Sequence, residues 1–228
     1  MKILICDKTE NEYIEQMRAA GLTVDVRDDI APEELMTVLP NYEGMVVRSR
    51  TKVRQPLIDV CPNLKVILRG GAGLDTIDYE YAKSKGIAVM NTPLANSASV
   101  AELAIGYMLM MARSLYQATA SVKADKWDKK SFNGDEIGGK TLGLIGVGNI
   151  GKEVAKRASV MGMAVLAYDP YVKEIDGIKL VTLDELLAQA DYISLHLPKT
   201  KESAGMIGAE QFAKMKNGVR IVNCARGG

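Results

Sequence analysis

Hydrophobic and polar positions follow two patterns along the first 91 residues. Short runs of β-branched and aliphatic residues, typical of buried strands, alternate with segments that have the apolar spacing of helices. The apolar runs are KILIC, TVDV, GMVVRS, KVILRG and IAVMN, and the helical segments include NEYIEQMRAAG and TIDYEYAKSKG. Strands that alternate with helices favour a parallel sheet with helices on both faces.

A long helical pattern follows, from about residue 97 to residue 127. Ser99, with Glu102 three residues later, is a candidate cap near its start. We expect one nearly unbroken helix, long enough to bridge two domains. A second alternation of strands and helices runs from KTLGLIGVGNIG to GVRIVNCARGG. The pattern therefore predicts two α/β units, 1–96 and 97–228, joined by one long helix.

Composition narrows the class of partner. The chain has 228 residues, 47% of them hydrophobic, which is enough to bury proper cores. Its net charge of +1 favours neither nucleic acid nor an anionic membrane, so small molecules are the expected partners. The longest apolar stretch, LAIGYMLMMA, is about half a membrane span. Three cysteines, far apart in apolar runs, suit reduced thiols in a cytoplasmic protein, and we predict no metal site.

The sharpest motif is GLIGVGNIG, in which Gly146, Gly148 and Gly151 form GxGxxG between a strand and a helix. Glycine suits a tight turn whose backbone approaches a pyrophosphate, and the helix N-terminus then faces the phosphates. Asp169 ends the next strand, 18 residues after Gly151, close to the spacing of a carboxylate that binds the adenosine ribose. Because no arginine follows Asp169, the predicted cofactor is NAD. The alternative is a glycine-rich turn beside an ordinary strand-end aspartate.

Three further features have both a functional and a structural interpretation. Arg48, at the end of a strand, belongs to a solvated charge cluster or to a site for an anionic substrate. The glycines of LRGGAGLD make a turn or an anion-binding nest of backbone amides. His196, the only histidine, is an acid–base residue or a wall of the cofactor pocket. No carboxylate lies beside His196 in the sequence to raise its pKa, which favours the interpretation of His196 as a wall of the cofactor pocket.

Seven motifs in order, VVRSRTKV, LRGGAGLDTID, VMNTPLANSASVAE, GKTLGLIGVGNIG, YDP, SLHLP and VNCARGG, resemble those of the NAD-dependent D-2-hydroxyacid dehydrogenases. The resemblance covers nearly the whole chain. It implies a flavodoxin-like substrate domain at 1–96 and a Rossmann-type NAD-binding domain at 97–228, the latter truncated at its C-terminal end, with the active site in the cleft between them. It also implies a homodimer formed through the NAD-binding domain. The implied substrate is an anionic 2-hydroxy or 2-oxo acid, for which 3-phosphoglycerate is our expectation.

The resemblance assigns roles to individual residues. Arg226 matches the catalytic arginine, whose guanidinium fork pairs with the substrate carboxylate and α-oxygen. Arg48 matches an arginine that holds the anionic tail of the substrate. The amides of Gly70, Gly71, Ala72 and Gly73 match the nest for the substrate carboxylate. Positions that match cofactor contacts are Ala72, Asn96, Val100, Gly146, Gly148, Asn149, Ile150, Gly151, Asp169, Pro170, His196, Leu197, Pro198, Ser203, Cys224 and Arg226.

Two features of the chain depart from the family pattern. Ala72 and Ser203 stand where members often carry threonine, which removes a hydroxyl at the first position and shortens the side chain at the second. The general base and its carboxylate partner follow the ARGG motif in the family, whereas this sequence ends at that motif. We therefore expect an N-terminal fragment that is inactive alone and gains activity with the missing segment.

Two alternatives to this function stay open. One is an NAD-sensing binding protein similar to the dehydrogenase-like corepressors. The other is a dehydrogenase for another 2-hydroxy acid, such as glyoxylate/glycolate or lactate.

Overall fold

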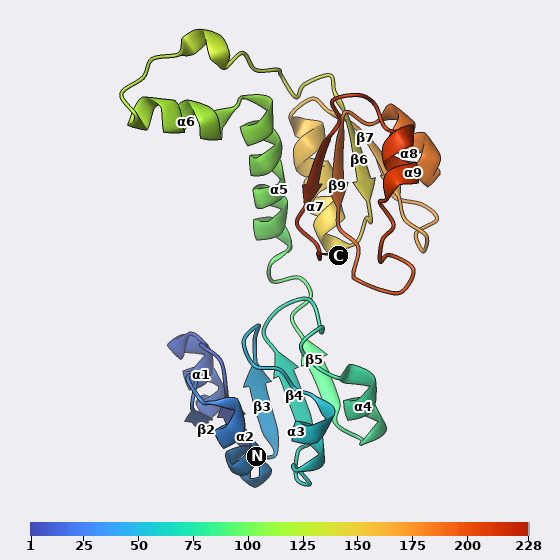
Figure 1. Ribbon diagram of the computed structural model, residues 1–228. Coiled ribbons are helices and arrows are strands. Elements are labelled where there is room, and N and C mark those ends of the chain that lie inside the picture. The colour runs from blue at the N-terminus through green and yellow to red at the C-terminus, as the bar shows by residue number, and fades with distance from the viewer. Residues whose placement is uncertain (228) are drawn as a thin grey trace. The chain divides into compact units, whose positions relative to one another are not determined.

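The structure is a computed structural model that describes residues 1–227. The chain divides into two compact units, Met1–Asn96 and Ser97–Gly228, called unit 1 and unit 2 below. Each unit is a parallel β-sheet with helices on both faces (Figure 1). This confirms the α/β class predicted from the alternating pattern.

Unit 1 contains a five-stranded parallel sheet in the order β2-β1-β3-β4-β5. All the strands predicted in this region are present. Their bounds are β1 Lys2–Ile5, β2 Thr23–Val26, β3 Gly44–Val47, β4 Val66–Arg69 and β5 Ala88–Asn91. This order is that of flavodoxin-like sheets, which bind ligands outside the carboxyl ends of their strands.

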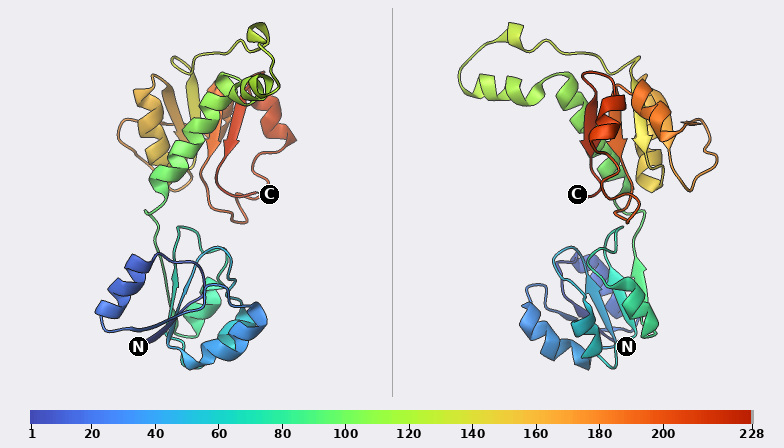
Figure 2. Two further views of the ribbon diagram at one scale, coloured as in Figure 1. Left: turned by 90° about the vertical axis from the view of Figure 1, so that its left-hand side faces the viewer. Right: turned by 45° about the vertical axis from the view of Figure 1, so that its right-hand side comes forward.

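The helices of unit 1 cover the two faces of this sheet unequally (Figure 2). The helices are α1 Asn11–Ala19, α2 Pro32–Val38, α3 Gln55–Asp59 and α4 Tyr79–Ser84, with a 3-10 turn η1 at Leu39–Asn41. Side chains of a strand alternate between faces, so Ile3 and Ile5 pack under helix α1 with its Ile14, whereas Leu4 and Cys6 face the opposite side.

Unit 2 contains a second five-stranded parallel sheet in the order β10-β9-β6-β7-β8. Its strands are β6 Thr141–Ile145, β7 Ala164–Tyr168, β8 Lys179–Leu180, β9 Tyr192–Leu195 and β10 Arg220–Asn223. The chain adds β7 on one side of β6 and β9 on the other. The order therefore reverses between β6 and β9, which is where such sheets bind ligands.

Helices complete the two layers of unit 2. Helices α5 Ser97–Ala112 and α7 Asn149–Val160 pack over a core that includes Met108, Leu144 and Val154. Helix α8, Leu183–Gln189, packs over a second core with Ile145 and Ile193, next to helix α9 at Ala209–Lys214.

The helix predicted from residue 97 to residue 127 is wrong in its extent. Helix α5 ends at Ala112 and a second helix, α6, runs over Leu115–Lys123 at an angle of 68° to it. Ser114 lies between them in the left-handed region, with φ +49°, and a right-handed helix cannot continue through such a residue. Both helices belong to unit 2. A short 3-10 turn, η2 at Lys129–Ser131, follows α6.

The cap predicted at the start of this segment is also wrong. Helix α5 begins at Ser97, so Ser99 lies inside the first turn rather than before it. Glu102 instead accepts from the guanidinium of Arg157 on α7 at 3.3 Å, which ties the two neighbouring helices together.

Within residues 1–227, no single helix combines the length and the apolar composition needed to cross a membrane, and α5 and α6 pass that test only as a bent pair.

Candidate functional site

The glycine-rich turn of unit 2 directly follows β6. The N–H of Gly146 donates to the carbonyl of Tyr168 at 2.8 Å, which fixes the turn against β7. Gly146 has φ +94°, and a Cβ there would lie 2.9 Å from Leu197 Cδ2 and 3.0 Å from the carbonyl oxygen of His196. Only glycine accepts both the backbone angle and this close approach of the chain after β9.

The other two glycines of the turn have different surroundings. A Cβ on Gly151 would collide with the carbonyl oxygen of Gly146, so this glycine lets α7 pack against the turn. A Cβ on Gly148 would meet no protein atom within 4 Å. Packing therefore explains why residue 151 is glycine but does not explain why residue 148 is. A ligand that approaches the backbone at residue 148 would require glycine at that position.

The start of α7 offers unpaired donors beside Gly148. No acceptor for the N–H groups of Gly148, Asn149, Ile150 or Gly151 lies within residues 1–227. These groups point out of the N-terminus of a 12-residue helix, where the helix dipole also favours negative charge. Such a helix start suits an anion such as a pyrophosphate.

The carboxylate of Asp169 is fixed beside this turn. Its Oδ2 accepts from the N–H of Val147 at 2.9 Å. Its Oδ1 accepts from the N–H groups of Tyr171 at 2.9 Å and Val172 at 3.3 Å, across the exposed Pro170. Since a carboxylate can accept about four hydrogen bonds, Oδ2 keeps capacity for one more donor.

His196 lies just after β9, next to the glycine-rich turn. Its backbone N–H donates to Ile145 at 2.8 Å, and its Nε2 lies 2.8 Å from the hydroxyl of the buried Ser194. Burial lowers the pKa of His196 to about 4, because the charged imidazole loses its hydration. Its Nδ1 is buried with no hydrogen-bond partner in the described part of the chain. The ring is therefore neutral at pH 7.

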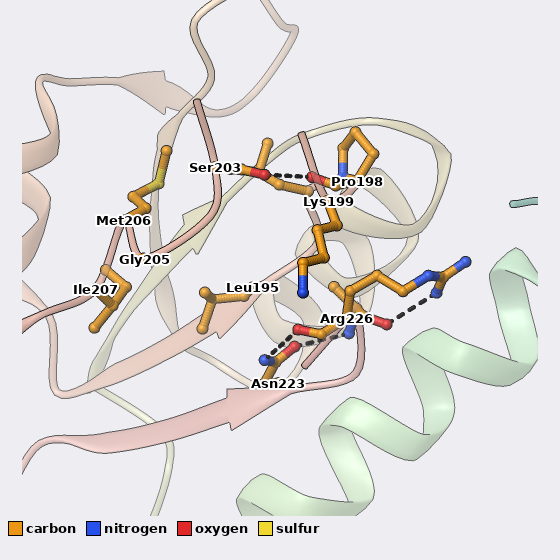
Figure 3. A pocket seen from close by; sticks show the side chains of 11 residues that line it. Leu195, Pro198, Lys199, Ser203, Gly205, Met206, Ile207, Asn223 and Arg226 are labelled. Atoms are coloured by element: carbon orange, nitrogen blue, oxygen red, sulfur yellow. Dashed lines mark hydrogen bonds between the residues drawn. The ribbon is translucent and has the colours of Figure 1, made fainter. Parts of the chain in front are cut away.

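A pocket of about 210 Å³ opens between the segment after β9 and the end of β10 (Figure 3). It brings together four residues predicted for the site: Leu197, Pro198, Ser203 and Arg226. It also includes Lys199 and Asn223, which the sequence reasoning missed. Their position was the available signal, because Asn223 ends β10 and Lys199 lies in the segment after β9, at the edge where the predicted site residues gather.

Hydrogen bonds shape the two walls of this pocket. The hydroxyl of Ser203 donates to the carbonyl of Pro198 at 2.7 Å, so it closes the loop after β9. Asn223 accepts from the N–H of Ala225 at 2.9 Å and donates to the carbonyl of Arg226 at 3.0 Å. Asn223 therefore holds the turn that carries Arg226, whose guanidinium extends away from Ser203 and Met206 in Figure 3.

The remaining predicted cofactor residues lie at separate places. Cys224 packs against the core under α5 and α7, and burial raises the pKa of its thiol. Val100 is half-buried on α5. Ala72 and Asn96 belong to unit 1, so each is described only within that unit.

Unit 1 places Arg48 beside the predicted nest. A Cβ on Gly70 would lie 3.3 Å from Arg48 Cγ, so the two segments after β3 and β4 are in close contact. The N–H of Gly70 donates to Val47 at 2.8 Å and is thus not available to a ligand, which corrects the prediction for that amide. The N–H groups of Gly71, Ala72 and Gly73 have no acceptor among the described residues.

Two side chains that the sequence reasoning missed support this edge of unit 1. The amide of Asn91 donates to the carbonyl of Ala72 at 2.6 Å and so holds the nest in place. The buried carboxylate of Asp7, at the end of β1, accepts hydrogen bonds from the segment that carries Arg48.

Within residues 1–227, no group of His, Cys, Asp and Glu side chains is arranged to hold a metal ion.

The glycine-rich turn, the free amides, the fixed Asp169 and the open space over Gly148 fit a dinucleotide, and the comparison with known families agrees. Residues 105–228 match the family described as D-isomer specific 2-hydroxyacid dehydrogenase, NAD binding domain. The chain therefore belongs to the D-2-hydroxyacid dehydrogenases, and its cofactor is NAD. This confirms the family and the cofactor that the seven motifs predicted.

Individual relatives narrow the resemblance further. The chain is 50% identical over 232 residues to a D-3-phosphoglycerate dehydrogenase of Archaeoglobus fulgidus, matching 100% of this chain and 44% of that protein. It is 52% identical over 202 residues to a hydroxypyruvate reductase of Thermotoga maritima, matching 88% of this chain and 66% of that protein. The chain thus spans less than two thirds of the length of both relatives.

A solved structure of similar fold carries ligands. The D-lactate dehydrogenase of Aquifex aeolicus, complexed with NAD and lactic acid, superposes with a TM-score of 0.86 at 33% identity. The match covers 100% of this chain and 69% of that one.

Proposed function

We propose that this chain binds NAD and an anionic D-2-hydroxy acid for hydride transfer between them, with 3-phosphoglycerate as the substrate. NAD supplies the hydride acceptor of this reaction when it is bound. The turn at Gly148 is the main support for this proposal. Its amides have no acceptor among the described residues, and no protein atom lies near the position of a Cβ on Gly148, so protein packing does not explain the glycine. The groups proposed for the substrate lie at Arg48 and Arg226.

In this proposal, Asp169 selects the cofactor. Its Oδ2 has capacity to accept a ribose hydroxyl, and the negative charge repels the additional phosphate of NADP. The chain should therefore bind NAD more tightly than NADP. Equal or tighter binding of NADP would contradict this role.

The substrate groups of unit 1 and unit 2 have different tasks. The free amides of Gly71, Ala72 and Gly73 suit the α-carboxylate, while the exposed guanidinium of Arg48 suits a more distant anion such as a phosphate. We assign to Arg226 the role of catalytic residue, which orients the α-carboxylate and α-oxygen through its two-pronged guanidinium.

The proton of the substrate hydroxyl needs a base, and the chain has one histidine. Burial lowers the pKa of His196 to about 4, so its imidazole is a weak base at neutral pH. We therefore assign His196 to the wall of the cofactor site. We also propose that the 228 residues alone do not oxidise the substrate. In this proposal, the base comes from a segment equivalent to the part of the relatives that lies outside the matched region.

Other substrates are the main alternative within this family. The 52% identity to a hydroxypyruvate reductase favours hydroxypyruvate and D-glycerate as the second candidate pair. A phosphate-binding role for Arg48 separates the two candidates, since only 3-phosphoglycerate carries a phosphate. An NAD-sensing binding protein remains the alternative of another class, and turnover of any 2-hydroxy acid would decide against it.

We also propose that the protein forms a homodimer through α6. No residue of this helix is buried, and Leu115 and Val122, seven positions apart and thus on one face, are 48% and 57% exposed. Trp127, beyond the helix, is 85% exposed. Exposed apolar side chains on one helix face favour a protein partner, and a second copy is the simplest one. The free thiols Cys6, Cys61 and Cys224 support a reducing, cytoplasmic location.

Calorimetric titration tests the substrate assignment directly. The chain, with saturating NAD, is titrated with 3-phosphoglycerate and with D-lactate, and Arg48→Ala is compared with the unchanged chain. We expect Arg48→Ala to weaken 3-phosphoglycerate binding by about 1.5 to 3 kcal/mol and D-lactate binding much less, because only the first ligand loses a charge-assisted contact. Equal losses for the two ligands would mean that Arg48 does not bind the phosphate.

A further inference from the structure

The carboxylate of Asp7 lies at the carboxyl end of β1, and its side chain is only 4% exposed. It accepts hydrogen bonds from the backbone N–H of Arg48, from the backbone N–H of Thr51 at 3.2 Å and from the hydroxyl of Thr51 at 2.7 Å. The Nε of Arg50 donates to it at 3.1 Å. All these donors belong to one segment, residues 48–51, which is therefore folded around a single buried carboxylate.

Arg50 extends this network to two other loops. Its guanidinium donates to the carbonyls of Cys6, Asp28 and Ile30, with distances of 2.8 Å to Asp28 and 3.0 Å to Ile30. The end of β1, the loop after β2 and the segment after β3 are thus linked through one side chain. Arg50 already makes this set of hydrogen bonds, so it serves the structure of the edge, whereas the neighbouring Arg48 donates only to the carbonyl of Lys8, at 3.2 Å, among the bonds described for its guanidinium.

We propose that Asp7 is a positioning residue for substrate binding, which acts through Arg48 by fixing the backbone from which that side chain extends. This inference rests on the proposed function of Arg48. Fixing the backbone matters because an ordered arginine loses less freedom when it pairs with an anion than one on a mobile loop. Asp7 itself is buried beneath the segment and is not proposed to touch the substrate.

The substitution Asp7→Asn tests this role with almost no change in side-chain size. Each carboxylate oxygen of Asp7 receives two donors: Oδ1 from Arg50 and Thr51, and Oδ2 from the N–H groups of Arg48 and Thr51. An amide NH₂ in either position would face a donor, so Asn breaks the network whichever way it turns. Asp25→Asn is the matched control, since Asp25 is a carboxylate on β2 of the same sheet that pairs with Lys2 and Tyr42 instead.

The experiment is a double-mutant cycle on 3-phosphoglycerate affinity, measured by calorimetry on the 228-residue chain with NAD present. Asp7→Asn should weaken binding of 3-phosphoglycerate by about tenfold and leave NAD affinity unchanged, whereas Asp25→Asn should change neither. In the Arg48→Ala background, Asp7→Asn should cause no further loss, because its effect passes through Arg48. Circular dichroism melting checks that each variant is folded at the titration temperature, and Asp7→Glu serves as a second variant that keeps the charge.

The outcomes separate this inference from the function on which it rests. If Arg48→Ala weakens binding but Asp7→Asn does not, or if the two losses simply add, Asp7 is a structural residue and the inference is wrong. If the unchanged chain does not bind 3-phosphoglycerate, or if Arg48→Ala binds it equally well, the proposed function fails together with the inference. Loss of folding in Asp7→Asn with full affinity in a folded Asp7→Glu would also overturn it, since Glu cannot reproduce the four contacts in the same place.

Discussion

Gly148 and Gly151 lie three residues apart in one turn, yet an added methyl group would meet different surroundings at the two positions. Gly148→Ala should change the free energy of unfolding by less than about 0.5 kcal/mol, because no protein atom is near the new Cβ. It should weaken NAD binding by at least about tenfold, because the methyl group occupies the space proposed for the pyrophosphate.

The matched variant is Gly151→Ala. Its Cβ would collide with the carbonyl oxygen of Gly146, so we expect a loss of about 1 to 3 kcal/mol in the free energy of unfolding. Urea unfolding and NAD titration of both variants measure the contrast. Unchanged NAD affinity in Gly148→Ala would remove the strongest local argument for the cofactor site.

His196 should stay neutral across the neutral pH range. Burial lowers its pKa to about 4, whereas an unfolded histidine titrates near 6.5. Between these two values the unfolded chain binds a proton that the folded chain does not, so stability is present above about pH 6.5 and is lost as the pH falls toward 4. The loss amounts to about 3 to 4 kcal/mol at most.

Because the chain has one histidine, its NMR signal can be followed without assignment work. We expect a midpoint near pH 4 and no titration between pH 6 and 8. In His196→Gln, the fall in stability between pH 6.5 and pH 4 should be smaller than in the unchanged chain, as measured by urea unfolding. A titration midpoint near 6.5 would restore His196 as a candidate acid–base residue.

At the scale of elements, the break between α5 and α6 depends on the left-handed conformation of Ser114, which has φ +49°. This conformation costs a non-glycine residue about 1 kcal/mol, and glycine adopts it without that cost. Ser114→Gly should therefore stabilise the connection by about 0.5 to 1 kcal/mol and slow hydrogen exchange of the α6 amides by about two- to fivefold.

The control for this prediction is Ala120→Gly, at an exposed position inside α6. There glycine lacks a conformational advantage and should speed the exchange of the same amides. Slower exchange in Ala120→Gly, or faster exchange in Ser114→Gly, would mean that the bend has another cause.

Sequence patterns predicted the long strands of both sheets, because a buried strand of four or five residues needs a continuous apolar run, which is visible in the sequence. They missed β8, Lys179–Leu180, since a two-residue edge strand has no such run. They missed the bend at Ser114 because neither glycine nor proline marks it. Asp7 was missed for a different reason: its partners lie 41 to 44 residues away, and only the parallel register of β1 and β3 brings them together.

The candidate cofactor residues follow the same rule. Gly146, Gly148, Gly151 and Asp169 could be proposed from the sequence because one local motif and one spacing define them, and their contact with NAD stays a prediction. Hydrogen bonds within the protein determine whether Ser203 and Gly70 can bind a ligand. The hydroxyl of Ser203 and the backbone amide of Gly70 already donate to other residues of the chain. No sequence pattern reports such pairing, so these side chains and amides required the structure.

At the scale of the whole molecule, the exposed helix α6 should set the oligomeric state. Sedimentation equilibrium should give a dimer for the unchanged chain. The double variant Leu115→Glu with Val122→Glu should give a monomer, because two carboxylates would lie on the proposed apolar contact. Val160→Glu is the control, since Val160 is 86% exposed at the end of α7 and should leave the dimer intact. A monomeric unchanged chain would contradict this use of α6.

NADH production from 3-phosphoglycerate is the most direct test of the central claim that this chain supplies the cofactor and substrate groups of a D-2-hydroxyacid dehydrogenase. Two proteins are compared: the 228-residue chain and the same chain joined to the remaining part of the Archaeoglobus relative, which is 50% identical over the matched region. We expect NADH from the joined protein and none above background from the 228 residues, because the imidazole of His196, with a pKa of about 4, is a weak base at neutral pH and general-base catalysis contributes about 10² to 10⁴ in rate. In the joined protein, Arg226→Ala should abolish the activity. Comparable NADH production by the 228 residues alone, abolished by His196→Ala, would contradict the account.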